Sequence, residues 1–101
     1  MLRQYVLDES GEPVRCDDLM TWGRYMQGDR HIGDDHIGDI HVSTVFLGLD
    51  HSFERSGPPV LWETMIFGGE HDEYQERYTS REEALKGHAK ALALVRGGSD
   101  G

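Results

Sequence analysis

Two runs of β-branched and aromatic residues constrain this chain more than any other feature. The first run, DIHVSTVFLGL, covers residues 39–49, and the second, VLWETMIF, covers residues 60–67. Both compositions are typical of β-strands. Neither run has a cleanly polar face, because apolar side chains fall at both odd and even positions. A sheet built on these strands therefore needs cover on both faces.

The clearest helix signal lies near the C-terminus. Ser80 and Glu83 have the spacing of a capping box, and Gly97-Gly98 would stop the helix that follows. We expect an apolar stripe on the inner side of this helix, with His88 on the same side. The residues of that stripe are Leu85, Ala89, Leu92 and either Val95 or Arg96.

Weaker signals complete the expected fold. They predict short strands at 3–8 and 14–15, a helix that begins after Asp17 or Asp18, a weak strand or ordered loop at 30–37, and an edge strand at 76–79. The sum is an α+β domain, with a small antiparallel sheet of about four to five strands and two helices packed on one face. We expect one domain over residues 1–97 and a flexible tail at 98–101.

Charge and composition exclude several classes of protein. The chain has 10 Lys+Arg against 19 Asp+Glu, which gives a formal net charge of −9. So acidic a surface repels nucleic acid, and we expect no general nucleic-acid binding. No apolar run approaches the roughly 18 residues of a membrane span, so we expect no membrane partner. The single cysteine, Cys16, excludes an internal disulfide and a cysteine-based zinc site.

The segment HIGDDHIGDIH at 31–41 holds three histidines and three aspartates, which are residue types that bind metal ions. Its spacing matches no standard metal motif. On a single strand His31 and Asp35 would share a face, whereas His36 and His41 would not. We therefore favour a polar hairpin, and we expect no metal ligand and no cofactor. The candidate turn positions of this hairpin are Gly33 and Gly38.

The candidate ligand-binding residues lie in the loop at 50–59 and beyond it. Glu63 falls between apolar neighbours in a strand, where a carboxylate acts as a general base or, in the interpretation we favour, pairs with an arginine such as Arg77. No catalytic residues are expected. The six candidate ligand-binding residues are His51, Phe53, Arg55, Glu63, Tyr74 and Arg77.

These candidates do not come together in a simple hairpin. The loop at 50–59 joins the two strong strands at one end, and Gly68-Gly69 then lies at the opposite end with the residues that follow it. One subunit would keep the two sets apart, whereas a two-fold dimer can place unlike ends side by side. We therefore expect an intersubunit site in which Arg55 and Arg77 contact an anion and Phe53 stacks on the ligand.

Three blocks of the chain carry a resemblance: VSTVFLGLDHSF at 42–53, GPPVLWETMIFGG at 57–69 and ERYTSREEALKGHAKAL at 76–92. With an opening Tyr-Val-Leu-Asp and a Thr-Trp near residue 21, they are similar to a widespread group of small phage and prophage proteins. The resemblance covers most of the chain. It implies a setting in the host cytoplasm and not a mechanism.

Three functions remain open within that setting. The first is a non-enzymatic counter-defence protein that sequesters a small nucleotide-like immune signal of the host within a homo-oligomer. The second is an acidic protein–protein inhibitor that blocks a host defence effector. The third, ranked last, is a small metal-dependent hydrolase that uses the His/Asp segment at 31–41.

We predict that the protein forms an oligomer, most simply a dimer, through the sheet face or edge that its helices leave uncovered. The alternative is that long loops cover that face. Light scattering at roughly tens of micromolar should give a mass above that of one chain, because an interface of standard size holds at that concentration. A strict monomer would contradict the prediction.

Overall fold

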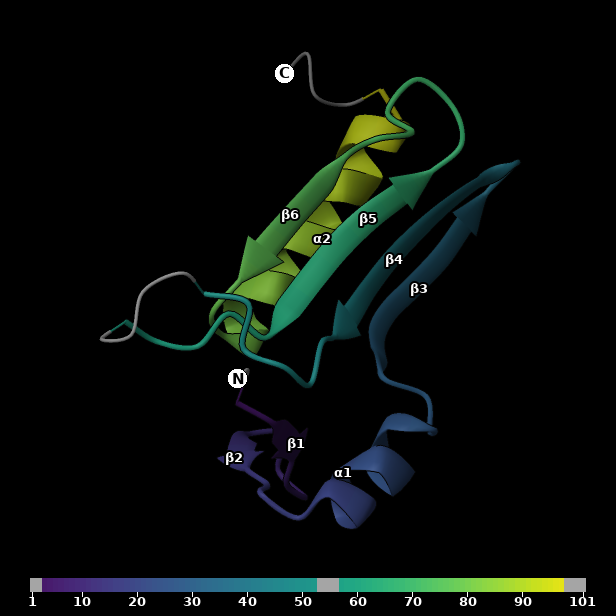
Figure 1. Cartoon of the computed structure of the whole chain (residues 1–101). Coiled ribbons are helices and arrows are strands. Elements are labelled where there is room, and N and C mark those ends of the chain that lie inside the picture. The colour runs from purple at the N-terminus through teal and green to yellow at the C-terminus, as the bar shows by residue number, and fades with distance from the viewer. Residues whose placement is uncertain (1–2, 53–56, 98–101) are drawn as a thin grey trace.

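The computed structural model describes residues 3–52 and 57–97 (Figure 1). In chain order, the elements are β1 (Tyr5–Leu7), β2 (Pro13–Arg15), α1 (Leu19–Met26), β3 (His31–Ile37), β4 (Ile40–Phe46), β5 (Trp62–Phe67), β6 (Gln75–Tyr78) and α2 (Arg81–Val95). Strands β3-β4-β5-β6 form an antiparallel sheet in that order, and β1 pairs with β2 in a separate hairpin. The predicted α+β class is confirmed. The tail at 98–101 lies outside the described residues.

The two helices occupy different places (Figure 1). Helix α2 packs along one face of the four-stranded sheet, as predicted, whereas α1 packs against β1, so the prediction that both helices lie on that face is wrong for α1. Helix α1 reaches the end of the sheet through Tyr25, whose ring meets Phe46 edge-on at a centroid distance of 6.2 Å. Gly48, which follows β4, connects both β1 and α1 to the sheet. Its carbonyl accepts hydrogen bonds from Tyr5 N (2.8 Å) and Trp22 Nε1 (3.1 Å). Neither helix in the described ranges is long and apolar enough to cross a membrane.

The segment 30–37, for which the sequence predicts a weak strand or an ordered loop, contains a full strand, β3. Its glycine-broken sequence is extended because it pairs along its length with β4. The hairpin turns at Gly38, whose φ of +60° suits a residue without a side chain, and not at Gly33. A β-bulge interrupts the pairing: His31 lies opposite Val45, while Gly33 lies opposite the next residue, Thr44.

The inner face of α2 differs from the predicted stripe. The buried residues of the helix are Ala84, Gly87, His88 and Ala91. Leu85 is instead 41% exposed and Ala89 is exposed as well, so the prediction that these two residues face inward is wrong. The reason is close packing, since small side chains let the helix approach the sheet. A Cβ at position 87 would overlap the hydroxyl and ring of Tyr78.

The face of the four-stranded sheet opposite α2 has no helix over it in the described part of the chain (Figure 1). Alternation along β4 and β5 places the apolar residues Val45, Met65 and Phe67 on this side, with Ser43 and Glu63 between them. Phe67 is 44% exposed. We refer to this surface as the uncovered face.

We predict opposite outcomes for two glycine-to-alanine substitutions in helices. Gly87→Ala should lower the free energy of unfolding by about 1–3 kcal/mol, because the overlap with Tyr78 outweighs the better helix propensity. Gly23→Ala is the matched control, since a Cβ there meets nothing within 4 Å. It should stabilise the protein by about 0.4–1 kcal/mol. Urea unfolding measures both, and a stabilised Gly87→Ala protein would contradict the packing described.

Candidate functional site

A pocket of about 480 Å³ lies where the segment after β4 meets the end of β6. It brings together residues 51–52 and 57–60 with residues 77–79. Among the described residues, the lining includes no carboxylate, although the chain carries a net charge of −9. The lining residues are His51, Ser52, Gly57, Pro58, Val60, Arg77 and Thr79.

Asp50 holds the two ends of the loop beside this pocket. Its Oδ1 accepts hydrogen bonds from the backbone N–H groups of Ser52 (2.9 Å) and Val60 (3.0 Å). The next residue, His51, donates its own N–H to the Val60 carbonyl at 3.0 Å. Burial by itself raises the pKa of Asp50, but the hydrogen bonds from Ser52 and Val60 and the nearby Arg3 outweigh it, and the net pKa is lowered. Asp50 is therefore ionised at neutral pH. We refer to its carboxylate, with the Ser52 and Val60 N–H groups that it binds, as the clamp.

Glu63 and Arg77 form the ion pair that the sequence analysis favoured. Arg77 Nε donates to Glu63 Oε2 at 2.9 Å, and Gln75 Nε2 donates to the same oxygen. The carboxylate is on the uncovered face, yet Glu63 is only 9% exposed. Because the pair uses Nε of Arg77, the two terminal nitrogens of the guanidinium group are outside it.

The expectation that two subunits are needed to unite the loop with Arg77 is wrong. Strand β6 runs back antiparallel to β5, with Arg77 opposite Glu63, so it returns the chain to the loop end of the sheet. One chain therefore places His51 and Arg77 in the same pocket. Phe53 and Arg55 lie outside the described residues.

Tyr74 lies elsewhere. Its hydroxyl donates to Glu76 at 3.0 Å, and its ring packs against the cluster formed by Val42, Ile66 and Ala91. Burial raises the pKa of Tyr74, and the hydrogen bond to Glu76 raises it further. Tyr74 is therefore a packing residue at the other end of the sheet, apart from the pocket.

A hydrogen-bond network that runs from the exposed Asp35 to buried side chains has the residue order of a catalytic triad. His88 Nε2 lies 2.7 Å from Asp35 Oδ2, and His88 Nδ1 lies 2.7 Å from Thr44 Oγ1. Thr44 Oγ1 also lies 2.6 Å from Thr64 Oγ1. Thr44 has no exposed surface, so its hydroxyl is closed to a substrate in this structure. The network joins β3, β4 and β5 to α2, which is a structural role.

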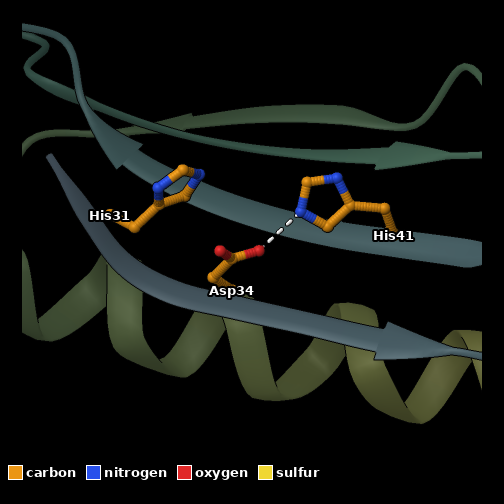
Figure 2. A group of neighbouring side chains, drawn as sticks. All are labelled: His31, Asp34 and His41. Atoms are coloured by element: carbon orange, nitrogen blue, oxygen red, sulfur yellow. Dashed lines mark hydrogen bonds and ion pairs between the residues drawn. The ribbon is translucent and has the colours of Figure 1, made fainter. Parts of the chain in front are cut away.

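His31 and His41 lie near Asp34 on the uncovered face (Figure 2), and the His36 ring stacks on that of His41. The prediction that His36 and His41 point to different faces is wrong, because the hairpin places them directly opposite each other. His41 Nε2 lies 2.6 Å from Asp34 Oδ1, and this hydrogen bond lowers the pKa of Asp34. Once the turn is placed at Gly38, the sequence alone predicts the pairing of 36 with 41.

Comparison of the chain with protein-family models, with curated proteins and with solved structures finds no match. The geometry of the pocket and of the uncovered face is therefore the basis of the functional assignment.

We predict that Asp50→Ala lowers the free energy of unfolding by about 1–3 kcal/mol, because two backbone N–H groups lose their buried acceptor. Asp50→Asn keeps an oxygen at that position and should cost less. Asp17→Ala is the control, since Asp17 makes only an exposed ion pair with Arg15, and it should change stability by less than about 0.5 kcal/mol. Equal effects at Asp50 and Asp17 would contradict the clamp.

The clamp also predicts a pH dependence. The folded-state pKa of Asp50 is lowered, so its ionised form stabilises the fold above the unfolded-state pKa of about 3.9, and this stabilisation disappears as the pH falls through the folded-state value. The stability difference between the native chain and Asp50→Asn should therefore narrow below about pH 4. Urea unfolding at neutral and acidic pH measures it, and a difference independent of pH would show that the charge has no role.

Proposed function

We propose that this chain is a non-enzymatic binding protein that holds a small anionic, nucleotide-like ligand in the pocket beside Asp50. The observation that carries the proposal is the lining of that pocket. The lining combines the polar residues His51, Arg77 and Thr79 with the apolar residues Pro58 and Val60. Its volume of about 480 Å³ falls in the range of small-molecule sites.

Arg77 is the anion-binding group of this proposal. Glu63 engages its Nε and fixes the plane of the guanidinium group. The two terminal nitrogens can then bind two oxygens of a phosphate or carboxylate in the forked geometry that arginine favours. The Arg77 side chain is 40% exposed, so a ligand can reach it.

The other lining residues suit the rest of a nucleotide-like molecule. The His51 ring offers a hydrogen bond, and the rings and methyl groups of Pro58 and Val60 offer an apolar surface for a planar base. Thr79 Oγ1 donates to Glu83 at 3.1 Å, which leaves its oxygen as an acceptor. The net charge of −9 disfavours a polyanion but leaves a small anion free to bind this local site.

The biological setting of the proposal comes from the resemblance to small phage and prophage proteins. In that setting the protein would sequester a nucleotide-like immune signal in the host cytoplasm. The apolar residues Val45, Met65 and Phe67 of the uncovered face support a homo-oligomer as its working form.

We predict that the double variant Glu63→Gln/Arg77→Gln binds ligand about 10- to 100-fold more weakly than the native chain, because it loses the charge-assisted contacts to the anion. This variant replaces a part-buried ion pair by two amides and keeps the net charge, so it separates binding from loss of fold. The measurement is isothermal titration calorimetry with nucleoside monophosphates, nucleoside diphosphates and cyclic dinucleotides, with inorganic phosphate for comparison.

Arg24→Gln is the control for this experiment. Arg24 is exposed on α1, outside the pocket, and its loss should leave ligand affinity unchanged. If no nucleotide binds the native chain, or if the double variant binds as tightly as the native chain, the pocket is not the ligand site. The alternative of an acidic protein–protein inhibitor, which the charge of −9 favours, would then take its place.

A further inference from the structure

We infer that the β3–β4 hairpin binds a divalent transition-metal ion of the zinc type through His31, Asp34 and His41. These side chains project from two neighbouring strands toward a common point on the uncovered face (Figure 2). One potential ligand atom from each of the three lies within 4.8 Å of the other two. Two imidazoles and one carboxylate form a ligand set that suits zinc and related first-row ions.

The β-bulge in β3 creates this arrangement. Residues three apart on a regular strand point to opposite faces, and His31 and Asp34 are three apart. The bulge adds Ile32 as an extra residue between the pairs His31–Val45 and Gly33–Thr44. That addition restores His31 to the face of Asp34, while Ile32 packs against the core. A β-bulge that turns a histidine side chain toward a carboxylate is typical of functional sites, because bulges often redirect side chains there.

His31 already has the outer partner that metal-bound histidines use. Its Nδ1 lies 2.8 Å from Asp29 Oδ1, and the backbone N–H of His31 donates to the same oxygen at 3.0 Å. A carboxylate on one ring nitrogen fixes the ring and leaves the other nitrogen, Nε2, as the ligand. Asp29 is thus a positioning residue for His31.

His41 is held in place by stacking. The His36 ring lies parallel to it, at a centroid distance of 4.3 Å and an angle of 3°, and Phe67 lies on it at 5.6 Å. An imidazole binds a metal ion in the plane of its ring, so two parallel stacked rings cannot share one ion. His36 is therefore a positioning residue for His41 and not a ligand in this arrangement.

The ligand atoms of His41 and Asp34 are close to the spacing that a metal ion requires. His41 Nε2 and Asp34 Oδ1 now share a hydrogen bond of 2.6 Å. Metal–ligand bonds of 2.0–2.1 Å at tetrahedral angles separate two ligand atoms by roughly 3.3 Å, so the pair opens by less than about 1 Å when an ion replaces the shared proton. Three protein ligands leave a fourth position open toward the solvent side of the sheet.

The test is titration of Zn²⁺ into the full chain, without a histidine tag and after treatment with a chelator, followed by calorimetry. We expect one ion per chain. Each of His31→Gln, Asp34→Asn and His41→Gln should weaken Zn²⁺ binding by about tenfold or more, since even outer partners of metal sites contribute that much. Thermal unfolding of each variant shows that it remains folded, because all three positions lie on the surface of the sheet.

Two further variants distinguish a specific metal site from nonspecific Zn²⁺ binding by histidines on the surface. His71→Gln makes the same replacement at a histidine outside the group of three and should leave the affinity unchanged. His36→Phe keeps the ring that stacks on His41 but removes its nitrogens, and it too should retain the native affinity. An equal loss in His71→Gln, a loss in His36→Phe, or no loss in the three ligand variants would overturn the assignment. Because the double variant Glu63→Gln/Arg77→Gln leaves the hairpin intact, its Zn²⁺ binding separates this site from the pocket.

Discussion

The hydrogen-bonded chain from Asp35 through His88 and Thr44 to Thr64 is the interaction on which the rest of the structure depends. It connects three strands of the sheet to α2 through side chains that are mostly buried. Leaving one of the three buried members, His88, Thr44 or Thr64, without its partner costs more than the hydrogen bond itself contributes, so the network specifies one position of the helix on the sheet. Gly33 is part of this constraint, since a Cβ there would lie 2.6 Å from the His88 ring.

The same network determines what the uncovered face presents. Because Asp35 turns toward His88, the neighbours on either side of it in β3, Asp34 and His36, must turn the other way. Helix α2 thus determines that the candidate metal ligands lie on the uncovered face, opposite the helix itself. The pocket lies at the opposite edge of the sheet, since Arg77 belongs to β6 and the hairpin histidines belong to β3 and β4. A substitution in one candidate site should therefore leave ligand binding at the other unchanged.

Local signals in the sequence predicted the elements well. Ser80 caps α2 as expected, with its Oγ accepting from the Glu83 N–H at 3.1 Å, while the Glu83 carboxylate accepts from the Thr79 hydroxyl. Asp18 caps α1 through its own side chain, which accepts from the Met20 N–H. The ion pair of Glu63 with Arg77 was also predictable, because a carboxylate in an apolar strand needs a partner. The inner face of α2 was not. Hydrophobicity favoured Leu85, whereas close packing against Tyr78 selected Gly87 and its small neighbours.

The amino-acid sequence by itself determined the fold class, the helix starts and the strong strands, because capping, turn chemistry and β-propensity act over a few neighbouring residues. Only the tertiary structure decided which distant residues share a surface. The return of β6 brought Arg77 to His51, and the bulge at Ile32 brought His31 to Asp34. Both depend on strand register, where a shift of one residue moves a side chain to the other face of the sheet. Register is a property of paired strands, and no single segment of the sequence encodes it.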